Sequence, residues 1–272
     1  MRNFLAKDTE IIKTNSSMRL TFLGTGTSVG VPTIGCTCKV CTSRDPHDRR
    51  TRCSAMIETE ATRIVIDCGP DFREQMLRQK FRKIDAVLVT HSHYDHVGGI
   101  DDVRPFCLFG DINIYCDPIS TQSLHTTMPY CFAEHLYPGV PKINLIKIQP
   151  HCRLQINELT VEPFQVMHDK LPILGFKIGR LAYITDMKTI PDAELPMLQD
   201  IDCLVVNALR FTRQHHSHML VDEAVAFAKR TSAKQIFFTH MCHDIGLHAE
   251  VNSILPSDFQ LAYDGQVVEI PE

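Results

Sequence analysis

The sequence predicts an α/β fold, because short β-branched, apolar segments alternate with segments of helical pattern along the chain. Helices are clearest at residues 71–80 and 221–230, and the second has an apolar stripe at Val221, Val225 and Ala228. The start of that second helix lacks a good capping residue, so its boundary stays open. Strands are predicted at residues 19–23, 54–58, 63–67, 86–90, 112–116, 159–166, 173–178, 181–185, 203–207, 235–239, 259–262 and 266–270.

Length and composition indicate an ordinary globular protein, with 272 residues of which 44% are hydrophobic and 22% charged. No linker divides the chain, so we predict an N-terminal extension at residues 1–17 and a single domain at residues 18–272. Residues 1–17 lack the apolar stretch of a secretory signal, and no apolar run reaches the roughly 20 residues that cross a bilayer. We therefore expect a cytoplasmic protein without a membrane partner. Whether the chain forms a homodimer stays open.

The net charge of −4 bears on the partners of the protein. Binding to a nucleic-acid backbone requires a broad basic surface, which this charge balance disfavours. A nucleic acid is therefore not the expected partner, and a small molecule is the expected substrate.

The motif THSHYDH, residues 90–96, directly follows an apolar strand. Residues two apart in extended backbone project to the same side, so His91 and His93 can converge on one metal ion. Asp95 and His96 follow at a turn and can face a second ion. Three imidazoles and a carboxylate within six residues suit borderline cations such as Zn²⁺.

Three later strands each end in a further candidate ligand: His168, Asp186 and His240. A single histidine at a strand end can equally be a structural residue, but the repeated placement favours a second set of ligands. Asp186 can contact both ions, since a carboxylate has two oxygens.

The sequence THSHYDHVGG resembles the signature of the metallo-β-lactamase superfamily, and the resemblance extends through nearly the whole chain. It implies an αββα four-layer sandwich with two metal ions, Zn²⁺ or Mn²⁺, at the sheet edge. It places His91, His93 and His168 at one ion, Asp95, His96 and His240 at the other, and Asp186 between them. Asp67 corresponds to the early aspartate of the superfamily, which orients ligands without binding metal; a turn-forming Asp before Gly69 is the alternative.

A site with the two metal ions that the resemblance implies is typical of a hydrolase. A water molecule between two divalent cations loses a proton near neutral pH and becomes a strong nucleophile. Asp95 is the expected catalytic carboxylate, because it can orient that hydroxide as well as bind metal.

A second cluster, Cys36, Cys38 and Cys41, supplies three thiolates within six residues. His243 can complete a Cys₃His tetrahedron, which predicts one structural Zn²⁺. A disulfide with a spare thiol is the alternative, which a reducing compartment disfavours.

The pairing of a dinuclear site with this cysteine cluster resembles the PhnP-type cyclic phosphodiesterases. Further matches are LTFLGTGTSVGVPTIGCTC near the start, DDVRPF after the histidine motif and THMCH near the end. The resemblance implies a general acid at His218, with His215 and His216 as rival positions in the same cluster. Arg104 can contact a substrate phosphate, although an ion-pair role is equally compatible with the sequence.

The leading interpretation is a metal-dependent phosphodiesterase for a small, cyclic or acyclic, phosphodiester. A ribonuclease Z-like endonuclease that processes tRNA 3′ ends uses the same ligands and is the alternative enzyme. A non-catalytic metal-binding accessory protein is the alternative of a different class. The identity of the substrate and of the metal lies beyond the sequence, because members of a superfamily share the metal centre and differ in their loops.

Overall fold

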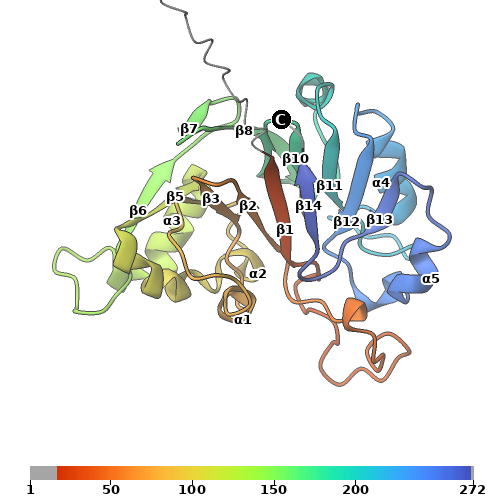
Figure 1. The fold of residues 1–272 in the computed structure, drawn as a ribbon, viewed down its shortest axis with the longest axis horizontal. Coiled ribbons are helices and arrows are strands. Elements are labelled where there is room, and N and C mark those ends of the chain that lie inside the picture. The colour runs from red at the N-terminus through yellow and green to blue at the C-terminus, as the bar shows by residue number, and fades with distance from the viewer. Residues whose placement is uncertain (1–16, 271–272) are drawn as a thin grey trace, which may run out of the picture.

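Two seven-stranded β-sheets face each other in the computed structural model, which describes residues 17–270 (Figure 1). In each sheet one half is antiparallel and the other parallel. The first sheet consists, in spatial order, of β14 (Val267–Ile270), β1 (Met18–Gly24), β2 (Ser54–Glu58), β3 (Arg63–Ile66), β4 (Ala86–Leu88), β5 (Ile112–Cys116) and β6 (Ile143–Lys147). The second consists of β13 (Phe259–Leu261), β12 (Gln235–Thr239), β11 (Cys203–Asn207), β10 (Leu181–Tyr183), β9 (Leu171–Ile178), β8 (Leu159–His168) and β7 (Leu154–Ile156).

Helices cover the outer face of each sheet (Figure 1). The first sheet packs against α1 (Phe72–Met76), α2 (Tyr94–Val97), α3 (Pro118–Thr127) and the 3₁₀ helix η2 (Ile100–Phe109). The second packs against α4 (Val221–Ala228) and α5 (His248–Asn252). Shorter 3₁₀ helices are η1 (Pro46–Asp48), η3 (Pro129–Cys131), η4 (Asp192–Leu198) and η5 (His243–Ile245).

Three apolar cores separate these layers. The central core lies between the sheets and includes Phe22 of β1 and Phe237 of β12, whose ring centroids are 5.5 Å apart. The other two cores lie between each sheet and its helices. This layering confirms the predicted αββα sandwich.

All twelve predicted strands are present, and β2, β5, β11 and β12 have the predicted bounds. The sequence missed β6 and β7, because these strands at the ends of the sheets are only partly buried and lack a clear alternation. The predicted helix at 71–80 is wrong beyond Met76, since α1 ends there and Leu77, the next residue, is 65% exposed. The second helix starts at Val221, where the carboxylate of Glu223 accepts a hydrogen bond from the Leu220 N–H at 2.8 Å and so replaces a capping side chain.

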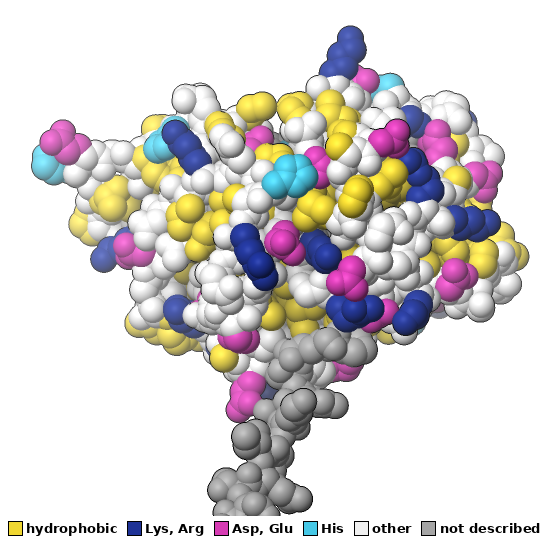
Figure 2. All heavy atoms as spheres, turned by 90° about the horizontal axis from the view of Figure 1, so that it is seen from above, with side chains coloured by type: hydrophobic (Ala, Val, Ile, Leu, Met, Phe, Trp, Pro, Cys, Tyr) yellow, Lys and Arg dark blue, Asp and Glu magenta, His cyan; other side chains and the backbone are white. Residues whose placement is uncertain are grey.

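The described residues bear on three further predictions: the N-terminal extension, the absence of a membrane span and the lack of a broad basic surface. Residues 1–16 of the predicted N-terminal extension lie outside the described residues, and β1 begins at Met18. No helix in the described part of the chain is long and apolar enough to span a bilayer. On the face shown in Figure 2, Lys and Arg side chains stand next to Asp and Glu side chains, with apolar patches between them. This face therefore does not present a continuous basic surface.

Candidate metal centre

Most predicted metal ligands lie at the ends of strands or in the loops that follow them, and Asp95 and His96 lie in α2. Ligand atoms of His91, His93 and His168 lie within 4.8 Å of one another. A second group, within the same limit, consists of Asp95, His96, Asp186 and His240. Asp186 also lies in a third group with His168 and His218, so its carboxylate is located where the two predicted ligand sets adjoin. The structure thus brings together all the residues predicted to hold the two ions.

The hydrogen bonds of His168 and His91 show which ring nitrogen of each keeps the lone pair that a cation needs, and His91 Nε2 lies 3.0 Å from His93 Nδ1 of the same ligand group. His168 Nδ1 lies 2.7 Å from the carbonyl oxygen of Asp186, which can only accept, so Nδ1 carries the hydrogen. Thr90 Oγ1 donates to Asp67 Oδ2 at 2.8 Å and therefore accepts from His91 Nδ1 at 3.1 Å. In both rings Nε2 consequently keeps its lone pair, as metal binding requires.

Asp67 is fully buried, and its carboxylate accepts three hydrogen bonds from two residues. Its carboxylate accepts from the backbone N–H of Thr90 at 2.8 Å, from the Thr90 hydroxyl, and from His96 Nδ1 at 2.7 Å. Asp67 thus contacts the predicted ligand His96 directly and the predicted ligand His91 through Thr90, which is the position that orienting such ligands requires. The role of Thr90 was not predicted, because its only signal in the sequence was its place directly before His91.

The electrostatics around His96 favour a cation. Burial by itself lowers the pKa of His96, but the carboxylates of Asp186 and Asp67 raise this pKa well above its ordinary value. His96 Nε2 is buried without a hydrogen-bond partner and lies 3.2 Å from both Asp95 Oδ2 and Asp186 Oδ2. A metal ion fits this arrangement, because it would be ligated by the free nitrogen and by both carboxylates. The residues present therefore fit the implied divalent cations.

Three residues that end strands hold a left-handed backbone conformation. The φ angles are 61° for Asp67 after β3, 55° for Asp186 after β10 and 55° for His240 after β12. Such angles are uncommon for residues other than glycine and cost on the order of 1–3 kcal/mol each. This backbone strain is therefore located at three residues of the predicted site.

Two glycines let the histidine motif approach the loop after β3. A Cβ atom on Gly69 would lie 2.1 Å from the carbonyl oxygen of Asp95, and one on Gly99 would lie 2.0 Å from that of Gly69. Any larger residue would separate these backbones. The close approach holds Asp95 and His96 beside Asp67.

We expect Asp67→Asn to weaken metal binding by about 10- to 100-fold, the usual effect of losing a residue that orients ligands. Asparagine tolerates the left-handed backbone, so the loop should keep its conformation. Titration of the metal-free protein with Zn²⁺ against a competing chelator measures the affinity. An affinity equal to that of the wild type would show that Asp67 only shapes the turn.

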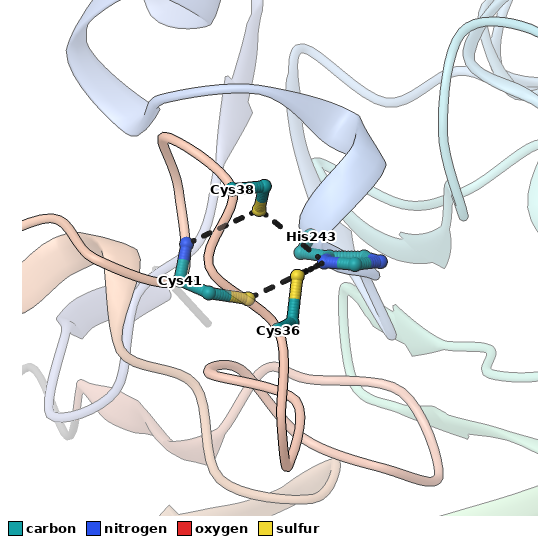
Figure 3. Close-up of side chains that lie close together, drawn as sticks. All are labelled: Cys36, Cys38, Cys41 and His243. Carbon is teal, nitrogen blue, oxygen red and sulfur yellow. Dashed lines mark hydrogen bonds between the residues drawn. The ribbon is translucent and has the colours of Figure 1, made fainter.

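The second predicted cluster also assembles, as Figure 3 shows. Cys36, Cys38 and Cys41 lie in the loop after β1, and their sulfur atoms are 3.1, 3.4 and 3.3 Å from Nδ1 of His243 in η5. All eleven cysteines are free, so the alternative of a disulfide is not found here. Three sulfurs around one imidazole nitrogen are the donor set of a Cys₃His zinc site.

Backbone amides add to this fit. The Cys41 N–H donates to Cys38 Sγ at 3.4 Å and thereby lowers the pKa of Cys38 to about 6, while burial raises the pKa of Cys41 to about 11. The Thr33 N–H donates to Cys41 Sγ at 3.3 Å. These donors stabilise negative charge on sulfur, the form that binds zinc.

Of the three clustered histidines, His218 lies nearest to the centre. It is buried, and its Nδ1 has no hydrogen-bond partner and is 3.7 Å from Asp186 Oδ1. His215 is partly buried against Ser217, and His216 is exposed and stacked on His215. Burial and the neighbouring His240 lower the pKa of His218 to about 3 although Asp186 raises it, so His218 is neutral here. The same position would allow His218 to act as a ligand beside His168 and Asp186.

Arg104 takes the ion-pair role that the sequence left open. Its Nη2 donates to Asp101 Oδ2 at 2.7 Å, and about half of its side chain is exposed. In the described part of the chain, no hydrogen bond or ion pair joins Arg104 to the predicted metal ligands.

Comparison with known proteins agrees with this fold and site. The chain belongs to the beta-lactamase superfamily, whose domain matches residues 62–241. Family and site together define a metal-dependent hydrolase. Within the superfamily, the chain is similar to the crystal structure of a new diphosphatase from the PhnP family, with 38% identity, a TM-score of 0.86, and coverage of 94% of this chain and 99% of that one. The predicted likeness to PhnP is thereby confirmed.

Two further relatives extend the comparison. A protein named octanoyltransferase from Porphyromonas gingivalis (strain ATCC BAA-308 / W83) is 42% identical over 256 residues, which are 94% of this chain and 52% of that protein. This chain therefore spans about half the length of that relative. The short form of human tRNase Z shares the fold, with 21% identity, a TM-score of 0.71, and coverage of 93% of this chain and 100% of that one.

Proposed function

We propose that the protein hydrolyses a small phosphodiester, cyclic phosphates included, at the residues around Asp186. The position of Asp186 carries the proposal: Oδ2 lies 3.2 Å from His96 Nε2, and Oδ1 lies 3.1 Å from His240 Nε2 and 3.7 Å from His218 Nδ1. The similarity to a diphosphatase over nearly the full chain supports a reaction at phosphorus.

Two divalent cations, Zn²⁺ or Mn²⁺, would lower the pKa of a water molecule here and offset the negative charge that develops on the phosphate oxygens. The proposed ligands are His91, His93 and His168 for one ion, Asp95, His96 and His240 for the other, and Asp186 for both.

Asp95 and His218 supply the proton chemistry in this proposal. Burial raises the pKa of Asp95, but His240 and His96 together lower this pKa below its ordinary value, so that Asp95 is ionised and can accept a hydrogen bond from the attacking water. His218, with its unpaired Nδ1, can hold the proton for the leaving oxygen. A neutral His218 must first gain this proton, which the negative charge of a bound phosphate would favour.

The charge of the chain favours a small substrate over tRNA. A polyanion is bound by many Lys and Arg contacts, whereas the net charge is −4 and the face in Figure 2 mixes both signs. The assembled ligand groups likewise favour an enzyme over an accessory protein, because binding metal for stability alone would not require a buried, unpaired His218 beside Asp186.

The relative named octanoyltransferase supports a second candidate, hydrolysis of an acyl thioester, which would use the same metal centre. We rank it lower, because this chain matches only 52% of that protein.

The two candidates, and the tRNA alternative, are separated by one panel of substrates. Protein loaded with Zn²⁺ or Mn²⁺ should hydrolyse bis(p-nitrophenyl) phosphate and small cyclic phosphodiesters, and should not cleave a precursor tRNA or octanoyl-coenzyme A. Cleavage of the thioester with no turnover of any diester would overturn the proposal in favour of the second candidate. Salt-sensitive cleavage of the precursor tRNA would favour the ribonuclease.

A further inference from the structure

A group of three hydroxyls and one thiol lies buried beside Asp186. Its members are Cys53, Tyr183, Thr185 and Thr239, each at most 1% exposed. Cys53 Sγ lies 3.3 Å from the Tyr183 hydroxyl, 3.1 Å from Thr239 Oγ1 and 3.7 Å from Thr185 Oγ1. Cys53 directly precedes β2 of the first sheet, whereas the three hydroxyls lie at or just after the ends of β10 and β12 in the second sheet. None of the four residues is a metal ligand in the proposed function.

Thr185 is the member of this group that touches a proposed ligand. Its Oγ1 lies 2.6 Å from Asp186 Oδ2. A hydroxyl has one hydrogen and an ionised carboxylate can only accept, so Thr185 donates to Asp186. The distance is typical of a hydrogen bond to a charged acceptor, which is stronger than a bond between neutral groups. Because a carboxylate is planar, this bond also fixes the direction of Oδ1, which lies 3.1 Å from His240 Nε2.

The start of β2 also supports the other two strand-end residues that have a left-handed backbone. Thr239, whose hydroxyl contacts Cys53, directly precedes His240. Ser54, the residue after Cys53, donates from its hydroxyl to the carbonyl oxygen of Asp67 at 2.8 Å. The three strand-end residues have φ angles between 55° and 61°, and such a conformation persists only where surrounding contacts hold it. Two consecutive residues of the first sheet thus supply contacts at or next to each of them.

We propose that Thr185 is a positioning residue, whose hydroxyl holds the Asp186 carboxylate so that its two oxygens face the two ligand groups. The proposal rests on the proposed function, in which Asp186 contacts both cations. The torsion that turns an aspartate carboxylate is broad and only weakly restrained by itself, so a fixed donor is needed to select one orientation. Cys53 and the hydroxyls around it hold that donor in place.

We expect Thr185→Val to raise the Kd for Mn²⁺ by about 10- to 100-fold, the usual effect of losing a residue that orients a ligand. Valine is branched at Cβ like threonine but has no hydroxyl, so the change is confined to the hydrogen bond. Titration of the metal-free protein with Mn²⁺ measures the affinity. Mn²⁺ suits carboxylate ligands, whereas soft thiolates select zinc, so this titration reports on the site at Asp186 and not on the cysteine cluster.

Two further variants separate the hydroxyl from the packing of the side chain. Thr185→Ser keeps the hydroxyl and should restore most of the wild-type affinity. Thr185→Ala lacks the hydroxyl and should show the same loss as Thr185→Val, which provides a second measurement where valine disturbs the fold. A Thr185→Ser protein that binds Mn²⁺ as weakly as Thr185→Val would overturn the proposal, because the hydroxyl would then not be the group that matters.

Thr121→Val is the matched control, since Thr121 is a buried threonine beside a different cysteine. Its hydroxyl donates to the Asp117 carbonyl at 2.8 Å and lies 3.2 Å from Cys116 Sγ, and neither of these residues is a proposed ligand. This variant should keep the wild-type affinity for Mn²⁺. Equal affinity of Thr185→Val and the wild type, or no binding to either, would overturn the proposal. The titration contains no substrate, so a failure to hydrolyse any phosphodiester would contradict the proposed function alone.

Discussion

Replacing Asp186 by asparagine is expected to lower kcat/KM for the phosphodiester by at least ~10³-fold, about 4 kcal/mol in the activation barrier, while the protein stays folded. The carboxylate is the point at which the two ligand groups adjoin, with oxygens 3.2 Å from His96 Nε2 and 3.1 Å from His240 Nε2. An amide has no negative charge and only one oxygen, so it can neither bridge two cations nor offset their charge.

Asparagine is a sharper test than alanine because the φ angle of Asp186 is 55°. Asparagine tolerates this left-handed backbone, whereas alanine would add strain and confuse loss of a ligand with damage to the loop. Asp169→Asn provides the matched control: Asp169 has the same φ of 55° but is exposed in the turn after β8. We expect Asp169→Asn to keep wild-type turnover.

Metal content decides how a loss of activity is interpreted. The Asp186→Asn protein should bind less of the active-site metal and keep its thermal unfolding temperature within a few degrees. Unchanged turnover would point to a contaminating enzyme and would revive the non-catalytic alternative. Loss of activity with wild-type metal content would instead assign Asp186 a role in catalysis that is independent of holding metal.

The predicted fold came mainly from the inner strands. These strands have continuous apolar segments because both of their faces are buried, as in β11 and β12. Strands at the ends of the sheets, such as β6, bury one face incompletely and gave no comparable signal. α3 was missed because PISTQSLHTT has few apolar residues, although Asp117 caps it by accepting from the Ser120 N–H.

The site was predicted from candidate ligands that directly follow apolar strands in the sequence. Their convergence follows from topology, since parallel strands expose their carboxyl ends at one edge of a sheet. The sequence could not show the left-handed backbone at Asp67 and His240, nor the hydrogen bond that fixes the tautomer of His168. The sequence also could not show that His218, and not His215 or His216, lies nearest to the metal centre, because this depends on burial.

The second large effect is expected from Cys41→Ala, which removes a ligand from the Cys₃His cluster. We expect the loss of one zinc ion per chain and a fall in the free energy of unfolding of about 2–3 kcal/mol, hence roughly 5–10 °C in Tm. The base of the cysteine loop is held independently of the cluster. Arg50 Nη1 donates to the Ala262 carbonyl at 2.5 Å, and Asp264 accepts from the Thr51 N–H at 2.7 Å.

The tip of that loop depends on the cluster, because its apolar contacts are few: Val31, Val40 and Cys41, with Leu247 beside them. Loss of zinc should therefore increase hydrogen exchange and proteolysis most in residues 31–45. Cys107→Ala is the matched control, since Cys107 is partly buried and lies in neither metal cluster. It should leave zinc content, Tm and exchange in the cysteine loop unchanged.

Activity should fall as well, by about tenfold, because the cluster also positions one wall of the active site. This wall consists of the segment that carries His240 and the loop that carries His218. His243 follows the predicted ligand His240 by three residues, and the Cys242 N–H donates to the Leu209 carbonyl at 3.1 Å. Arg213 pairs with Asp244, which ties the loop that carries His218 to the same segment. Displacing such a wall by about 1 Å can cost up to ~10²-fold in rate. A Cys41→Ala protein with wild-type zinc content and Tm would refute the zinc site, whereas loss of zinc with wild-type activity would refute only its coupling to His218.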